Sequence, residues 1–87
     1  MSITVEVTYD MSKELGTQRF EVEGAERVAD VVRLTRERFG DAIDRFDTLT
    51  RITAVAVNGV LVNYRKQMKT AVRDGDTVSF LKPAAGG

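Results

Sequence analysis

The side chains that could do chemistry in this 87-residue chain are carboxylates, lysines and hydroxyls, because the sequence contains neither Cys nor His. That composition excludes disulfides and thiol nucleophiles, and it removes the imidazole base and the commonest ligands of zinc. A nucleophile and its base would have to be assembled from lysine or carboxylate alone. We therefore expect no metal site and no enzyme active site.

Two groups of acidic residues have the spacing of paired catalytic or metal-binding carboxylates. Asp74 and Asp76 flank Gly75, and Asp is favoured in such turns because its side chain bonds to nearby backbone amides. We interpret this pair as part of a turn. The second group is interleaved with arginines, which favours a solvated helix face, and consists of Glu37, Asp41, Asp44 and Asp47.

Basic residues gather in the segment that precedes this turn. They are Arg65, Lys66, Lys69 and Arg73. They fit a solvated loop or, as the alternative, a docking surface for an acidic partner. Over the whole chain 13 basic and 13 acidic residues cancel, which argues against nucleic-acid binding. No apolar run approaches the roughly 20 residues of a membrane span, and no leader pattern is present, so we expect a cytoplasmic protein without a membrane partner.

Gly86 and Gly87 place two residues without side chains before a carboxylate. Such a thread can enter a narrow tunnel of another protein, because glycine permits a backbone approach that a Cβ would block. A free carboxylate is also a group that ATP can activate as an acyl-adenylate. The alternative interpretation is a frayed or engineered terminus.

The elements that must position this tail are predicted from periodicity. Alternating apolar residues predict strands over residues 3–9 and 18–23, joined as an antiparallel hairpin by a polar connection. Spacings of three and four then predict a helix of about three turns from Val28 to Phe39, with Gly40 as a left-handed C-cap. Residues 41–46 look like a further helical turn that is capped by Asp41 and docks Ile43 and Phe46.

The second half of the chain predicts three more strands. Residues 53–58 should point Val55 and Val57 inward and the small Ala54 and Ala56 outward, and Asn58-Gly59 predicts a tight turn into residues 60–62. A polar, irregular segment follows over residues 63–70. The last strand, residues 77–82, should point Val78 and Phe80 inward and Ser79 and Leu81 outward, and it ends at Pro83. We expect an α+β domain over residues 1–83, with one mixed sheet of four to five strands under a single helix, and a flexible tail over residues 84–87.

Several motifs together resemble the ubiquitin-like sulfur carriers. They are Val57-Asn58-Gly59, Leu61-Val62, the run from Asp74 to Leu81 with its Asp-Gly-Asp turn, a proline, and Gly86-Gly87. This family includes the small subunit of molybdopterin synthase, the thiamin-pathway carrier and the small archaeal modifier proteins. The resemblance implies a β-grasp fold.

The resemblance also implies a mechanism. A ubiquitin-activating-type adenylyltransferase would consume ATP to adenylate Gly87, next to Gly86, and a sulfur donor would convert it to a thiocarboxylate. The carrier itself would bind no cofactor, and a molybdopterin synthase large subunit is one possible recipient. The implied partner-binding residues are Leu61, Leu81, Lys82 and Pro83. By alternation we expect both leucines to be exposed, although Leu61 could instead only cover the edge of the core. Conjugation to lysines, with Lys13, Lys66, Lys69 and Lys82 as acceptors of a second copy, and a non-covalent ubiquitin-fold interaction module are the alternatives.

Three positions depart from the family pattern. Lys82 stands where relatives often have the first of two prolines, so the tail could leave at a different angle. Thr8 stands where relatives place an apolar contact. Arg27 precedes the helix where a capping Ser or Thr is usual, which predicts a weak N-cap.

Overall fold

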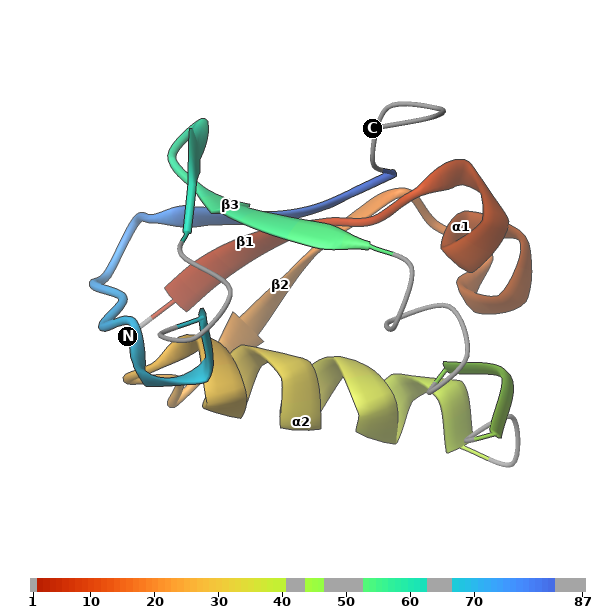
Figure 1. Cartoon of the computed structure of the whole chain (residues 1–87). Coiled ribbons are helices and arrows are strands. Elements are labelled where there is room, and N and C mark those ends of the chain that lie inside the picture. Colours follow the sequence, from red (N-terminus) through yellow and green to blue (C-terminus); the bar gives the residue numbers. More distant parts are fainter. Residues whose placement is uncertain (1, 41–43, 47–52, 63–66, 83–87) are drawn as a thin grey trace.

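A computed structural model describes residues 2–40, 44–46, 53–62 and 67–82, with the side chain of Gln67 excepted. It contains a five-stranded mixed sheet in the order β2-β1-β5-β3-β4. The helix α2 runs across one face of this sheet, and the other face is open (Figure 1). The predicted arrangement of one sheet under one main helix is confirmed.

The first two strands pair as predicted, but their connection differs from the prediction. β1 (Ser2–Glu6) and β2 (Arg19–Glu23) are antiparallel. The predicted polar connection contains a helix, α1 (Tyr9–Leu15). Its N-cap is Thr8, whose Oγ1 accepts from the backbone N of Met11 at 3.2 Å, and the fully buried Met11 anchors it to the core.

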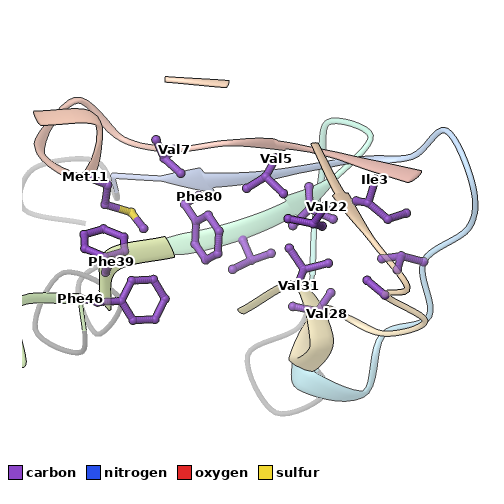
Figure 2. Close-up of a cluster of buried hydrophobic side chains, with 14 residues drawn as sticks. Ile3, Val5, Val7, Met11, Val22, Val28, Val31, Phe39, Phe46 and Phe80 are labelled. Carbon is purple, nitrogen blue, oxygen red and sulfur yellow. The ribbon is translucent and has the colours of Figure 1, made fainter. Parts of the chain in front are cut away.

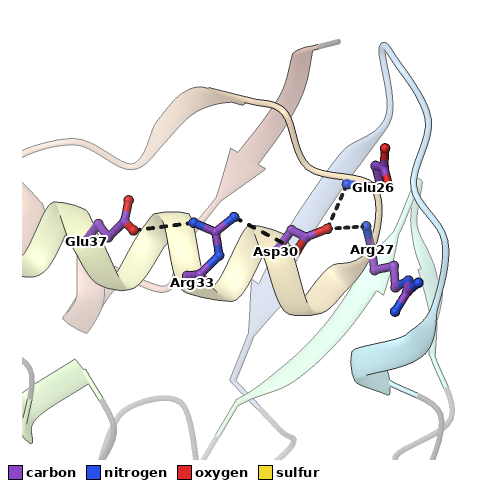
Figure 3. A network of polar contacts seen from close by, with 5 residues as sticks. All are labelled: Glu26, Arg27, Asp30, Arg33 and Glu37. Atoms are coloured by element: carbon purple, nitrogen blue, oxygen red, sulfur yellow. Dashed lines mark hydrogen bonds and ion pairs between the residues drawn. The ribbon is translucent and has the colours of Figure 1, made fainter.

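Helix α2 (Val28–Phe39) matches the predicted span. Its N-terminus is closed by Asp30, whose carboxylate accepts from the backbone N of Glu26 at 3.0 Å and of Arg27 at 3.1 Å (Figure 3). Arg27 makes no side-chain cap, as predicted, and Asp30 compensates for it from inside the helix. Both bonds hold the carboxylate in its ionised form, so they lower the pKa of Asp30.

Helix α2 ends at Gly40, as predicted, but Gly40 does not adopt the left-handed helical conformation that was expected of this cap. Gly40 has φ 56° and ψ −116°, so its φ is positive but its ψ lies far from the left-handed helical region. On the outer face of α2, Arg33 lies between Asp30 at 3.9 Å and Glu37 at 3.4 Å (Figure 3). Glu37 and Asp44 are exposed, as expected for a solvated face, whereas Asp41 and Asp47 lie outside the described residues.

The remaining strands follow the predicted order. They are β3 (Ala54–Val57), β4 (Val60–Leu61) and β5 (Thr77–Leu81). β5 is parallel to β1 and antiparallel to β3. Between the last two comes a short 3₁₀ helix, η2 (Gln67–Lys69), which replaces part of the predicted irregular segment.

The turn between β3 and β4 is the predicted two-residue one. Asn58 has φ 51° and Gly59 φ 83°, and a type I′ turn requires positive φ at both central residues. One burial prediction on β3 fails, because Ala56 is only 1% exposed although it lies on the face opposite Val55. A methyl group is short enough for larger neighbours on a sheet to cover it.

The core lies between the sheet and α2 (Figure 2). Val55, Val78 and Phe80 point toward the helix, as predicted, and are at most 2% exposed. At the far end of α2, the ring of Phe46 lies 4.8 Å from that of Phe39, which confirms that Phe46 docks on the core. Asp41 and Ile43 lie outside the described residues.

Candidate functional site

The two ends of β5 differ in how their side chains are used. At the first end, Asp76 accepts a hydrogen bond from Asn58 Nδ2 at 2.9 Å and another from the backbone N of Arg73 at 2.8 Å. Asn58 Oδ1 in turn accepts from the backbone N of Thr77 at 2.9 Å. Asp74 accepts from the backbone N of Ser2 at 2.7 Å. These contacts tie two turns and the start of β1 together.

The Asp-Gly-Asp motif therefore has a structural role, as predicted. The side-chain hydrogen bond from Asn58, followed by the backbone hydrogen bond from Arg73, lowers the pKa of Asp76 below its usual value. A carboxylate with a lowered pKa is a poor general base at neutral pH. The contacts at this end of the sheet therefore hold the fold together.

The opposite end of β5 presents an apolar residue to solvent. Leu81 is 42% exposed, and Leu61 on the edge strand β4 is 64% exposed. The pairings Ala54–Leu81 and Ala56–Leu61 place both leucines on the open face of the sheet. The alternative that Leu61 only covers the edge of the core is not supported, because Leu61 faces away from α2.

A cleft lies beside Leu81. The parallel pairing of β1 and β5 ends at Glu6–Ser79, whereas the hydrogen bond from Val7 N to Gln18 O, at 3.0 Å, continues the contact on the β2 side. Beyond the last β1–β5 pair lies a cleft of about 320 Å³ whose walls include Val7, Tyr9, Leu81 and Lys82. The cleft thus lies at the Leu81 end of β5.

The structure brings three of the predicted site residues to this face or its margin and leaves the others untested. Leu61 and Leu81 lie on the open face, and the exposed Lys82 lines the cleft. Pro83, Gly86 and Gly87 lie outside the described residues.

Two other predictions have mixed outcomes. Thr8 caps α1 and so has a local structural role. In the predicted basic patch, Lys69 and Arg73 are exposed, whereas Arg65 and Lys66 lie outside the described residues.

Sequence reasoning missed Tyr9. It is 67% exposed at the start of α1, and Lys13 Nζ lies 4.6 Å from the centre of its ring. The pair is spaced i,i+4 on the helix, so recognition of α1 would have predicted the contact.

A cluster of acidic side chains would mark a metal site, and a long apolar helix would mark a membrane span. Within the described residues, no three acidic side chains gather in a way that could hold a metal ion. None of the helices described here has both the length and the apolar character of a membrane span.

Comparison with solved structures identifies the fold as ubiquitin-like β-grasp. A molybdopterin converting factor subunit 1 from Pyrococcus furiosus is 22% identical with a TM-score of 0.74, over 95% of this chain and 98% of that one. Small archaeal modifier protein 1 from Haloferax volcanii is 17% identical with a TM-score of 0.75, over 94% and 97%.

A third structure is more similar in sequence. A chain of the BexX/CysO complex from Amycolatopsis orientalis is 26% identical with a TM-score of 0.75, over 98% of this chain and 99% of that one. Among curated protein sequences, none matches. The model of the ThiS family matches residues 9–87. The chain therefore belongs to the ThiS family of ubiquitin-like sulfur carriers, with protein modifiers among its structural neighbours.

Proposed function

We propose that this chain is a sulfur carrier whose Gly87 carboxylate is activated by a ubiquitin-activating-type adenylyltransferase. The thiocarboxylate that results delivers sulfur in the biosynthesis of a molybdopterin-like or related cofactor. The partner enzyme supplies the catalytic groups and consumes the ATP. Residues 1–83 form the domain that the partner recognises, and residues 84–87 form the segment that it receives.

The chemistry balances without a catalytic group from the carrier. The Gly87 carboxylate oxygen attacks the α-phosphorus of ATP, and pyrophosphate leaves. Hydrosulfide then attacks the acyl carbon of the adenylate, AMP leaves, the S–H proton passes to solvent, and the thiocarboxylate remains. Adenylation is needed because a free carboxylate is a poor acyl electrophile, whereas the mixed anhydride with AMP carries AMP as a good leaving group.

The observation that carries this proposal is the family match, which extends to residues 86 and 87. The names of the relatives support it further, because one is a molybdopterin converting factor subunit and another was crystallised in complex with BexX. Both matches span nearly the whole of each chain.

The open face of the sheet supports the same proposal, because it has the features of a surface that a partner contacts. Leu61 and Leu81 expose apolar surface that folding does not bury, and such surface commonly marks a protein contact. Lys82 and Pro83 follow Leu81 directly, so a partner docked here would stand at the beginning of the tail. We assign partner binding to these four residues.

Intact mass spectrometry of the protein from its native host tests the proposal. We expect a fraction of the chain to carry one sulfur in place of one oxygen, located at Gly87 by fragmentation. A variant without Gly86 and Gly87 should lack this species, and the control Ala85→Ser should retain it. A wild-type chain that never carries sulfur while the cofactor is being made would contradict the proposal.

Conjugation to proteins is the second candidate, favoured by the likeness to a small archaeal modifier protein. Lys13, Lys69 and Lys82 are exposed and would be available to accept a second copy, and Lys66 lies outside the described residues. A Gly87 remnant on lysines of other proteins would favour this candidate. A non-covalent interaction module would keep its cellular function after deletion of Gly86 and Gly87.

A further inference from the structure

The open face of the sheet has two halves of different chemistry. On β3, β4 and β5 it carries Ala54, Ala56, Leu61 and Leu81. On β1 and β2 the register places three carboxylates on the same face, those of Glu6, Glu21 and Glu23. The pairings Glu6–Arg19 and Glu6–Ser79 join the two halves in one continuous row. We call the three glutamates on β1 and β2 the acidic strip.

The acidic strip is poorly neutralised within the chain. Arg19 is the single cation among the described residues of these two strands, and it forms no ion pair with the strip at 4.0 Å or less. Glu6 accepts one hydrogen bond, from Ser79 Oγ at 3.3 Å, whereas Glu21 and Glu23 are exposed. By contrast, Glu37 on α2 and Glu14 on α1 each pair with an arginine, Arg33 and Arg45 respectively. Arg38, which reaches β2 from α2, donates to the backbone O of Glu21 at 3.2 Å and not to a carboxylate of the strip.

The geometry lets one partner cover both halves. Adjacent strands lie about 4.8 Å apart, so the row from Leu61 on β4 to Arg19 on β2 spans about 19 Å across four strand spacings. A standard protein interface buries about 800 Å² on each side, which is wider than either half alone. A partner that covers the leucines and this row therefore contacts Glu6, and Glu21 and Glu23 lie two and four residues, about 7 and 13 Å, farther along β2 at its margin.

We propose that the partner of the open face is a protein with an apolar centre, which covers Leu61 and Leu81, and a basic margin, which covers the acidic strip. This inference rests on the proposed function, because it takes the adenylyltransferase as that partner. The two halves are not interchangeable, so a complementary surface fits the sheet in one orientation. That orientation fixes the direction in which the chain beyond Lys82 leaves β5 and reaches the partner's ATP site.

The test is ATP–pyrophosphate exchange by the host's purified adenylyltransferase, with the full-length chain as the varied substrate. The variant Glu21→Lys/Glu23→Lys reverses two charges of the acidic strip. Its matched control is Glu37→Lys, which reverses an exposed charge on α2, on the other side of the molecule. Circular dichroism confirms that each variant is folded, and Glu21→Gln/Glu23→Gln provides an intermediate charge.

We expect the double reversal to raise the KM for the chain about tenfold at low salt, with kcat close to wild type, because rim charges act mainly on encounter and orientation. The increase should shrink to about twofold near 0.5 M NaCl, where charges are screened over a few ångströms. The KM of Glu21→Gln/Glu23→Gln should lie between those of wild type and the double reversal, and the KM of Glu37→Lys should match wild type at both salt concentrations. A structural defect would raise the KM by the same factor at both salt concentrations.

Three results would overturn the inference. If wild type drives exchange and the double reversal has the same KM at low salt, the acidic strip is not part of the contact. If light scattering finds a wild-type dimer that Leu61→Asp dissociates, the occupant of the face is a second copy. If the wild-type chain drives no exchange, the proposed function fails and this inference fails with it.

Discussion

The side chains at the two ends of β5 differ in whether their contacts lie within the chain. At the Thr77 end, Asn58 donates a hydrogen bond to Asp76, and both side chains accept hydrogen bonds from nearby backbone amides, so every one of these contacts is internal. At the Leu81 end, an apolar side chain stays 42% exposed beside a cleft. The first end therefore holds the fold together, whereas the second leaves apolar surface that we propose a partner covers.

Substitution of Leu81 should give the largest effect and should separate function from stability. Leu81→Asp places a charge in the proposed apolar contact, so we expect the KM for the chain in ATP–pyrophosphate exchange to rise about 100-fold. The free energy of unfolding should change by less than about 1 kcal/mol, because the side chain is partly exposed. The matched control is Met68→Asp on η2, since Met68 is 41% exposed and lies beside α2. Equal effects of the two variants would contradict the comparison.

Substitution of Asn58 should give the reverse pattern. Asn58→Ala removes two side-chain hydrogen bonds and leaves a Cβ residue other than Asn at φ 51°, so we expect a loss of about 2 kcal/mol in the free energy of unfolding. Asn58→Gly also lacks these hydrogen bonds, but glycine tolerates the positive φ of the turn, so its loss in the free energy of unfolding should be smaller than that of Asn58→Ala. Urea denaturation measures both. Exchange kinetics of the folded fraction should stay at the wild-type level, and a large loss there would show that this end also contacts the partner.

A third variant changes stability without touching either end. Thr35 is fully buried in α2, and within the part of the chain described its hydroxyl has no hydrogen-bond partner. Thr35→Val removes an unsatisfied polar group at nearly constant volume, so the free energy of unfolding should rise by about 1 kcal/mol. Thr35→Ser keeps the hydroxyl, removes a methyl group and should be less stable than wild type. A more stable Thr35→Val with altered exchange kinetics would mean that stability and docking are coupled.

The smallest effect concerns pH. The folded pKa values of Asp30 and Asp76 lie below their usual values, so the ionised carboxylates stabilise the fold above the unfolded pKa of about 3.9. This stabilisation should disappear as pH falls below about 4 and through the folded pKa values. Asp76→Asn should reduce the slope of unfolding free energy against pH in that window, whereas Leu81→Ala should leave the slope unchanged. A slope unaltered by Asp76→Asn would remove the electrostatic role given to the Thr77 end.

Much of the fold is predictable because its signals are local. The alternation in β1 and β5, the helical spacing from Val28 to Phe39 and the Asn58-Gly59 turn each depend on a few neighbouring residues. Helix α1 was missed because Met11 and Leu15 are its only aliphatic residues and the rest of its surface is polar. Thr8 and Gly16, which cap it at either end, were the available signals.

The candidate site is less predictable because it depends on pairing between distant segments. Alternation alone placed Leu61 and Leu81 on an exposed face, and their exposure confirms it. The cleft, however, is lined by residues that lie far apart in the sequence and meet beyond the last β1–β5 pair, Glu6–Ser79. The acidic strip likewise requires the register of β1 against both β2 and β5, and the burial of Ala56 requires side chains from other strands.

The central claim is that the carboxylate of Gly87 is the group on which an outside ATP-dependent enzyme acts. The most direct measurement incubates the purified chain with the host adenylyltransferase, MgATP and sulfide, and then determines its intact mass. We predict one sulfur-for-oxygen exchange at Gly87 in wild type and in Ala85→Ser, and none in a variant that lacks Gly86 and Gly87. Sulfur gained at another residue, or an equal gain by the truncated variant, would contradict the account.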